Sequence, residues 1–321
     1  MVIPLFNCLS LTQAMFSSLQ ATLPAGLEYE IIFVDDGSTD GTRDWLAGLT
    51  ASNGASSIRV LLNERNFGYA IGNNRGTAIA CGDFLALLNN DLVLQPGWLE
   101  PMLDAHRSLG TQAGIIGNIQ RDARTGKIDH TGIVINQNGK PVHDHELPTG
   151  FMGNPVRVRR VPAVTGACLL VHRDLWRELG GFDEGYVNGA EDVDLCFRAR
   201  ALGRSNAVAL TSTVLHHISS SAGRKLRDEE NSYRLVSRWR REFVLAADGP
   251  FREWSWDYFE KHLPDPRLAN PALARHALFY ALGLRRTPPP DAIAFIEERQ
   301  AREFQRWESL FPGVRADSIG R

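Results

Sequence analysis

Carboxylates stand directly after two runs of large apolar residues. Asp35 and Asp36 follow the run from Ile31 to Val34, and Asp91 follows the run from Phe84 to Leu88, with two asparagines between. Neither run alternates with polar residues, which is typical of strands that are buried on both faces of a parallel sheet. Open α/β sheets bind their ligands beyond the carboxyl ends of such strands, so these side chains are candidates for ligand binding.

The two acidic positions favour different chemistry. The loop after Asp36, from Gly37 to Thr42, is acidic and contains no Lys, so we expect it to contact a ribose, a base edge or a metal rather than a bare phosphate. A Mg²⁺ or Mn²⁺ ion on a nucleotide takes one or two carboxylates together with phosphate oxygens, and Asp91 is a candidate for one of them. The same pattern is also typical of a turn Asp that caps the next helix.

A third acidic cluster begins a predicted helix. Glu191, Asp192 and Asp194 fall within four residues, and the helix dipole stabilises acidic side chains in a first turn. Three carboxylates exceed what capping requires, so their repulsion favours a role with a cation or in proton transfer. His216 and His217 follow a further apolar run. A lone His is more often structural, but these two are candidate metal ligands in a chain that also offers a carboxylate.

The elements that must position these residues alternate along the first two thirds of the chain. The apolar runs are Val2-Ile3, Ile31–Val34, Ile58–Leu62, Phe84–Leu88, Ile115-Ile116, Ala167–Val171 and Ala207–Leu210, and helices are predicted near 11–22, 41–50, 69–80, 97–108 and 173–180. This rhythm predicts an α/β fold with a mostly parallel, doubly wound sheet flanked by helices. We expect one domain over 1–222 and a mainly helical C-terminal extension over 223–321.

The rhythm is interrupted between about residues 121 and 160, where the chain is polar and rich in Gly. Asn138-Gly139 predicts a β-hairpin turn there, and such an excursion is a natural place for a specificity loop. The run from His143 to Glu146 has metal-binding residue types. We favour an exposed loop near the acceptor over a metal site for it.

Composition excludes several classes of protein. The 321 residues carry a formal charge of -2, from 35 basic and 37 acidic residues, which argues against a general nucleic-acid binder. The four cysteines are far apart and form no C-x-x-C pair, so zinc ribbons and thioredoxin-like motifs are excluded. No apolar stretch is long enough to span a membrane and no leader precedes the first strand, which Met1 almost enters, so we expect that strand to be short. We expect a cytoplasmic protein with at most a peripheral association with the inner face of the membrane.

Taken together, these residues resemble the inverting glycosyltransferases of family 2, which have the GT-A fold, in their rhamnosyltransferase-like, polysaccharide-synthesising form. The matching pieces, in chain order, are Val2–Asn7, Val34–Thr42, Asn66–Ala70 with Asn73–Gly76, Leu88–Asp91, Thr165–Cys168, Gly181–Glu184, Glu191–Cys196 and His216. Each piece alone is weak, and their order over about residues 1–245 carries the resemblance.

The resemblance implies a role for each matching residue. The nucleotide-sugar donor would contact Pro4, Phe6, Asn7, Asp36, Asn66, Gly68, Asn74, Asn90 and Asp91. Asp91, at the last position of the family's D-x-D element, and His216, rather than His217, would bind Mn²⁺ or Mg²⁺. Asn89 and Asn90 depart from the acidic D-x-D pattern. Asp192 matches the catalytic base and Glu191 would orient the acceptor, which is a glycan or glycoconjugate.

Three other interpretations compete with this one. A sugar nucleotidyltransferase needs a Gly-rich basic loop after the first strand, where Asn7–Ser10 stand instead, and a NAD-binding dehydrogenase needs a G-x-G-x-x-G there. A non-catalytic nucleotide- or sugar-binding domain of a larger assembly stays open, because the sequence does not show that Asp91, Asp192 and His216 converge.

Weaker signals lie in the C-terminal third. Arg224 and Lys225, after the serines at 219–221, predict either a solvated helix face or a loop that closes over the diphosphate. The aromatic residues between 251 and 259 and the terminal helix with Trp307 are expected to pack within their own domain or to form a subunit interface.

Overall fold

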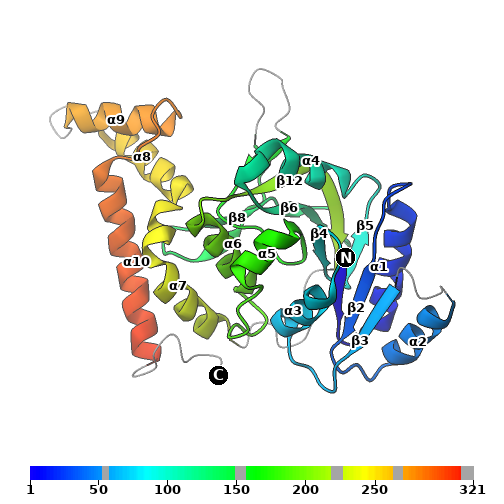
Figure 1. Ribbon diagram of the computed structural model, residues 1–321. Helices are drawn as coiled ribbons and strands as arrows, with labels where there is room; N and C mark the ends of the chain where they lie inside the picture. Colours follow the sequence, from blue (N-terminus) through cyan, green and yellow to red (C-terminus); the bar gives the residue numbers. More distant parts are fainter. Residues whose placement is uncertain (53–57, 149–156, 218–226, 263–269, 312–321) are drawn as a thin grey trace. The chain divides into compact units, whose positions relative to one another are not determined.

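The computed structural model describes residues 1–52, 58–148, 157–217, 227–262 and 270–311. These form two compact units, which are described separately (Figure 1). The first contains residues from 1–133 and 143–228, and the second contains residues from 134–142 and 229–311. The expected division at residue 222 stays a prediction.

The first unit is a central sheet with helices on it, as the sequence predicts. The strands of this sheet are β1 (Val2–Leu5), β2 (Ile31–Asp35), β3 (Ile58–Leu62), β4 (Phe84–Leu88), β5 (Leu92–Leu94), β6 (Ala113–Asp122), β7 (Ile128–His130), β10 (Val158–Arg160), β11 (Cys168–His172) and β12 (Ser205–His216). The helices are α1 (Leu9–Thr22), α2 (Thr42–Ser52), α3 (Tyr69–Ile79), α4 (Glu100–Leu109), α5 (Arg173–Leu179) and α6 (Glu191–Ala201), with a 3₁₀ turn at Gly110–Gln112. The α/β fold class is confirmed.

The strand order is β10-β12-β6-β11-β4-β1-β2-β3, with β5 paired to β12 and β7 paired to β6. Strands β3, β2, β1 and β4 run parallel, and β11 runs antiparallel between β4 and β6. Because β12 is parallel to β6, strands β1, β2, β4, β6 and β12 all point the same way. Their carboxyl ends therefore lie along one edge of the sheet.

The apolar runs form central strands because their side chains pack against helices in the core. All five residues of β2 are buried, and Phe33 meets Phe16 of α1 and Trp45 of α2 edge to face, with ring centroids 5.5 and 5.7 Å apart. On α3, a Cβ added to Gly76 would collide with Val2 and lie 2.9 Å from Val34 Cγ2. This glycine therefore lets α3 approach β1 and β2 closely.

The second unit joins a β-hairpin to four helices. Its elements are β8 (Ile133–Ile135), β9 (Pro141–His143), α7 (Asp228–Leu245), α8 (Asp248–His262), α9 (Pro271–Ala281) and α10 (Pro290–Leu310). The predicted hairpin turn is confirmed, since the N–H of Asn136 donates to the carbonyl of Lys140 at 2.9 Å and Gly139 has φ +77°. Lys140 Nζ lies 3.1 Å from Glu303 Oε1, which fastens the turn to α10.

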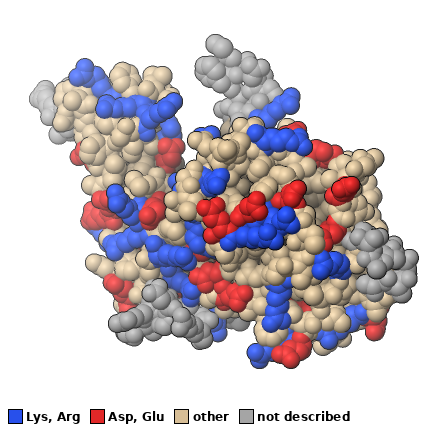
Figure 2. Space-filling view, viewed as in Figure 1, with Lys and Arg blue, Asp and Glu red and all other residues tan. Residues whose placement is uncertain are grey.

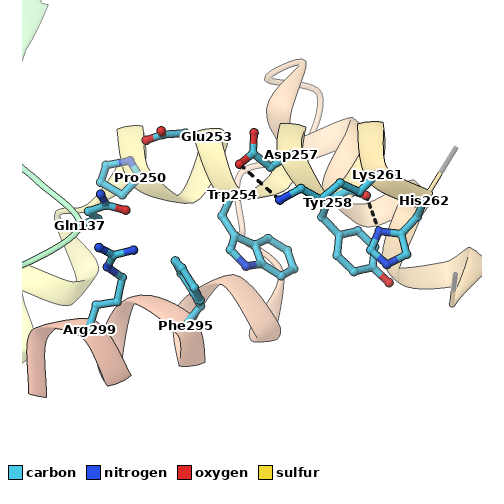
Figure 3. Close-up of a pocket in the computed structure, with 10 residues that line it drawn as sticks. All are labelled: Gln137, Pro250, Glu253, Trp254, Asp257, Tyr258, Lys261, His262, Phe295 and Arg299. Carbon is cyan, nitrogen blue, oxygen red and sulfur yellow. Dashed lines mark hydrogen bonds and ion pairs between the residues drawn. The ribbon is translucent and has the colours of Figure 1, made fainter. Parts of the chain in front are cut away.

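Part of the aromatic cluster predicted between 251 and 259 forms a ladder along α8. The rings of Trp254 and Tyr258 stack at 5.1 Å, and those of Tyr258 and His262 stack at 4.1 Å. Figure 3 shows these rings beside Phe295 and Arg299 of α10, around a pocket of about 250 Å³. Within the described part of this unit, Trp254 and Tyr258 thus face α10, whereas Trp256 of the same cluster is 43% exposed.

Of the helices in the described segments, none is both long and apolar enough to cross a membrane.

Candidate functional site

Four of the predicted site residues meet at the edge of the sheet where the parallel strands end. Asn7 follows β1, Asp36 follows β2 and Asp91 follows β4. His216 is the last residue of β12. Residues that are up to 209 positions apart in the sequence thus share one edge (His216 against Asn7). This is the part of an open α/β sheet where ligands bind.

Asp36 holds the loop that follows β3. Its side chain is 4% exposed. Its Oδ2 accepts hydrogen bonds from the N–H groups of Phe67 at 2.9 Å and Gly68 at 2.8 Å, and its Oδ1 accepts one from Asn63 Nδ2 at 2.8 Å. The carboxylate charge is stabilised by these donors. Asp36 therefore shapes the loop containing Asn66, whose own Oδ1 accepts the N–H of Gly68 at 2.9 Å.

The loop after β1 is tied to the loop after β2. The N–H of Asn7 donates to Ser38 Oγ at 2.8 Å, and Asn7 Oδ1 accepts the N–H of Thr39 at 2.8 Å. Asn7 has φ 55°, a left-handed conformation that Asn tolerates better than most residues. Beside it Phe6 is 48% exposed, which leaves an apolar ring at the sheet edge. Pro4 lies within β1, opposite Val34.

Asp91 and His216 form a close pair across the same edge. His216 Nε2 lies 3.2 Å from Asp91 Oδ1, and the exposed fractions are 4% for His216 and 9% for Asp91. The backbone adds a link, because the N–H of His217 donates to the carbonyl of Asp91 at 3.0 Å. It is thus the ring of His216 that approaches the carboxylate. Neither of its ring nitrogens makes a hydrogen bond within the described segments.

This pair could bind a divalent cation whose remaining ligands come from the phosphates of a nucleotide. A neutral imidazole and a carboxylate are both metal ligands, and a buried imidazole without a hydrogen bond leaves its lone pair available. Among the described residues no three His, Cys, Asp or Glu side chains gather as a metal site. Two protein ligands are nevertheless what a cation bridging phosphates commonly takes. Next to Asp91, Asn90 Nδ2 donates to Thr12 Oγ1 of α1 at 2.9 Å.

The predicted base stands at the start of α6 and is bonded to the segment before β11. Asp192 Oδ2 accepts the N–H of Gly166 at 2.7 Å, and its Oδ1 accepts the N–H of Val193 at 2.8 Å. The next residue, Ala167, accepts the N–H of Asn89 at 2.9 Å. Two consecutive hydrogen bonds therefore connect Asp192 with the Asn89–Asp91 segment.

The loop before α6 is strained. Asn188 and Ala190 have φ values of 50° and 72°, and non-Gly residues in the left-handed region store energy and cluster at functional sites. Asn188 Oδ1 accepts the N–H of Tyr69 at 3.3 Å, which connects this loop to the start of α3. Glu191 is 6% exposed, and its Oε2 accepts the N–H of Gly189 at 2.7 Å.

Two predicted residues have structural contacts instead of an open side chain. Asn74 clamps the segment before that loop: its Oδ1 accepts the N–H of Phe182 at 2.9 Å, while its Nδ2 donates to the carbonyl of Phe182 and to Glu184 Oε1, each at 2.9 Å. Asp194 is fully buried and pairs with Arg198 Nε at 2.7 Å. Both therefore support the site through the loops and the helix that they hold.

Sequence reasoning missed a row of buried polar residues behind the site. Gln120 of β6 lies opposite both Val214 of β12 and His130 of β7. Gln120, His130 and Asn118 are fully buried, and within the described segments the side-chain nitrogens and oxygens of Gln120 and His130 have no hydrogen-bond partner. Residues 117–122 read Gly-Asn-Ile-Gln-Arg-Asp, with neither an apolar run nor an alternation, so the sequence carried no signal that β6 extends to Asp122.

The burial of His130 predicts a stability that depends on pH. Burial, together with His143, His145, His216 and Arg159, holds the pKa of His130 well below its ordinary value of 6.5. As the pH falls through about 6.5, His130 becomes protonated in the unfolded state but stays neutral in the folded state. The free energy of unfolding therefore decreases. We expect His130→Asn to remove up to about 1.4 kcal/mol of this loss per pH unit. Urea unfolding of both proteins from neutral to mildly acidic pH measures the difference. The prediction would be contradicted if the two proteins lost the same free energy of unfolding between neutral and mildly acidic pH.

The weaker signals are only partly within the described residues. Asp144 pairs with Arg159 at 2.5 Å, and His143 Nδ1 lies 4.0 Å from Asp129 Oδ2. The expected exposure of the His143–Glu146 run is confirmed for His143, His145 and Glu146, although His143 ends β9 instead of lying in a loop. Its nearness to the acceptor stays a prediction. The serines at 219–221, Arg224 and Lys225 lie outside the described residues.

Comparison with known proteins assigns the chain to a family. Residues 1–180 match the family described as "Glycosyl transferase family 2". The chain is 31% identical over 275 residues to the uncharacterized protein y4gI of Sinorhizobium fredii, a match that covers 84% of this chain and 29% of that protein. It is 30% identical over 164 residues to the O-antigen biosynthesis protein RfbC of Myxococcus xanthus, covering 49% and 13%. The chain thus spans less than a third of either relative.

A third relative is closer in length. The chain is 27% identical over 240 residues to the N-acetylglucosaminyl-diphospho-decaprenol L-rhamnosyltransferase of Mycobacterium tuberculosis, covering 68% of this chain and 74% of that protein.

Solved structures are similar in fold. GalNAc-T7 with UDP, GalNAc and Mn²⁺ superposes with a TM-score of 0.62 at 16% identity, covering 96% of this chain and 55% of that chain. The mannosyltransferase PcManGT of Pyrobaculum calidifontis, in complex with GDP-Man and Mn²⁺, gives 0.51 at 14% identity, covering 99% and 76%. These similarities confirm the expected GT-A fold. The match over residues 1–180 shows that the chain belongs to glycosyl transferase family 2.

Proposed function

We propose that this protein is an inverting glycosyltransferase, which moves a sugar from a nucleotide-sugar donor to a hydroxyl of a glycan or glycoconjugate. The observation that carries the proposal is the connected arrangement of Asp192, Gly166, Ala167 and Asn89 beside the Asp91–His216 pair. It brings a candidate base and a candidate phosphate-side cation site to one edge of the sheet.

The donor would lie across the ends of the parallel strands. Phe6 offers an apolar face for a base, and the loops held by Asn7 and Asp36 form the surroundings of the nucleoside. Asp91 and His216 would hold Mn²⁺ or Mg²⁺, as the neighbouring structures with UDP or GDP-Man and Mn²⁺ suggest. Bound there, the ion would supply positive charge that stabilises the departing diphosphate.

Asp192 would act as the general base. Its carboxylate takes the proton of the acceptor hydroxyl while that oxygen forms a bond to the anomeric carbon. The bond from that carbon to the diphosphate breaks on the opposite face, so the configuration inverts. A positioned base contributes about 10²–10⁴-fold to the rate. The contacts with Gly166 and Val193 fix the carboxylate, and Glu191 would orient the acceptor through the loop that it holds.

The acceptor belongs to the synthesis of a surface polysaccharide or glycoconjugate in this proposal. The similarity to an O-antigen biosynthesis protein and to a rhamnosyltransferase supports that class. The cytoplasmic setting expected from the sequence stays a prediction.

A panel of UDP, GDP, dTDP and CMP, each with and without Mn²⁺, tests the donor site. A ligand that binds only the folded state raises the melting temperature with its concentration. We expect one nucleoside diphosphate to give a larger shift than the others, and Mn²⁺ to increase it. A folded protein that shifts with none of them would contradict the proposal and favour a non-catalytic binding domain.

A further inference from the structure

The end of α9 and the turn after it expose large apolar side chains. Phe279 is 46% exposed, Leu282 is 54% exposed and Leu284 is 73% exposed. Single exposed hydrophobic residues need no explanation, but a group of them marks an interaction site. These three fall between positions 279 and 284, so they are neighbours along the chain.

The backbone holds this turn in place. The N–H groups of Leu284 and Arg285 donate to the carbonyl of Phe279 at 2.8 and 3.1 Å, and the N–H of Gly283, at φ +74°, donates to the carbonyl of Tyr280 at 2.9 Å. An Arg252 guanidinium N–H donates to the same Tyr280 carbonyl at 2.8 Å. The turn is therefore ordered from both sides, and its apolar side chains are presented outward.

The core beneath this turn is already occupied by another side chain of α9. The ring of Tyr280 is 1% exposed and belongs to a core cluster with Phe251 and Ile296. Its hydroxyl donates to Asp248 Oδ1 at 2.5 Å. The exposed apolar side chains lie on either side of Tyr280, which already occupies the core position. They are therefore available to contact another molecule.

The charged residues of this segment of the chain have one sign. Arg275, Arg285 and Arg286 are exposed, and no Asp or Glu occurs between residues 270 and 290. Arg275, Phe279 and Leu282 are spaced by four and three residues, which puts them on one face of the helix. Figure 2 shows Lys and Arg side chains gathered over the region that Figure 1 labels α9. The surface combines exposed apolar side chains with three arginines, and the nearby carboxylate of Asp248 is paired with Arg252 at 2.8 Å.

We propose that this surface, made of Arg275, Phe279, Leu282 and the turn Leu284–Arg286, docks on an anionic lipid bilayer. An interface of this kind takes apolar side chains at the boundary of the acyl chains and basic side chains among the headgroups. A symmetric contact between two copies through this surface would bring both sets of arginines into one interface, which opposes self-association. The proposal does not depend on the chemistry proposed above.

Co-sedimentation of the full chain with vesicles tests the docking. Phosphatidylcholine vesicles are compared with vesicles of phosphatidylcholine and phosphatidylglycerol in equal parts, at low and high salt. We expect binding to the anionic vesicles only, weakened by salt. Leu284→Glu should weaken it about tenfold or more. Arg285→Gln and Arg286→Gln should each weaken it about fivefold and reduce the salt dependence.

Leu245→Glu is the matched control, because Leu245 ends α7 and is 64% exposed. It should bind vesicles like the unaltered protein, and both variants should keep the nucleotide-induced shift in melting temperature. Failure of the unaltered protein to bind anionic vesicles would overturn the proposal, as would equal losses in Leu284→Glu and Leu245→Glu. A dimer that Leu284→Glu dissociates, without vesicle binding, would identify the surface as a self-interface instead.

Discussion

Replacing Asp192 with Asn is expected to lower the rate of sugar transfer by about 10²–10⁴-fold while nucleotide binding stays unchanged. The amide has the size of the carboxylate and keeps one oxygen, which can still accept the N–H of Gly166 and so hold the segment before β11 against α6. It gives up the second bond, from the N–H of Val193 within the first turn of α6. What it loses is the ability to take a proton from the acceptor. Initial rates of transfer and nucleotide titrations on the same preparation measure both quantities.

Asp174→Asn provides the control for this change. Asp174 also lies in the first turn of a helix, α5, but its side chain is 77% exposed and has no role at the sheet edge. It should transfer sugar at the unaltered rate. A rate in Asp192→Asn within about tenfold of the unaltered protein would remove Asp192 as the base, since a positioned base is worth more than that. Loss of nucleotide binding in the same variant would instead show that Asp192 organises the donor site.

The sequence predicted the structure well where a local residue pattern is typical of a single structural environment. The uninterrupted apolar run at Ile31–Val34 predicted a fully buried strand, and β2 is buried at every residue. The carboxylates at the ends of such runs were expected at one edge of the sheet, and the parallel order of β1, β2 and β4 puts Asp36 and Asp91 there. Local pattern therefore carried both the fold class and the edge where the site lies.

Contacts between distant segments could not be predicted in the same way. Asp36 was expected to contact the nucleotide-sugar donor, and its hydrogen bonds to Phe67 and Gly68 depend on how the loop after β3 folds back. The pairing of Gln120 with His130 depends on β7 returning along β6 within a stretch whose polarity predicted a loop. Such contacts arise from tertiary packing, and no spacing in the sequence encodes them.

The loop before α6 shows a related limit. The run of acidic residues from Glu191 was visible, but the positive φ values at Asn188 and Ala190 were not, because Ala carries no preference for that conformation. A Gly at these positions would have indicated the left-handed conformation from the sequence. The bond from Asn188 to Tyr69 explains how the strain is held, since it joins the acidic loop to α3.

Replacing Asp91 with Asn is expected to remove the effect of Mn²⁺ on nucleotide binding and to lower the rate of transfer by about 10²–10³-fold. The backbone carbonyl that accepts the N–H of His217 is untouched, so the edge of the sheet should keep its shape. The amide lacks the charge that attracts a divalent cation. Melting curves with the preferred nucleoside diphosphate, with and without Mn²⁺, measure the metal effect directly.

His216→Gln and His217→Gln separate the metal site from its surroundings. The ring of His216 lies 3.2 Å from Asp91, whereas His217 is bonded to Asp91 through its backbone. We therefore expect His216→Gln to lose the Mn²⁺ effect and His217→Gln to keep it. Because two ligands of one ion act as a unit, the Asp91→Asn, His216→Gln double variant should be no worse than the more severe single variant. Additive losses would mean that the two side chains contribute separately, and a Mn²⁺ effect lost only in His217→Gln would move the ligand by one residue.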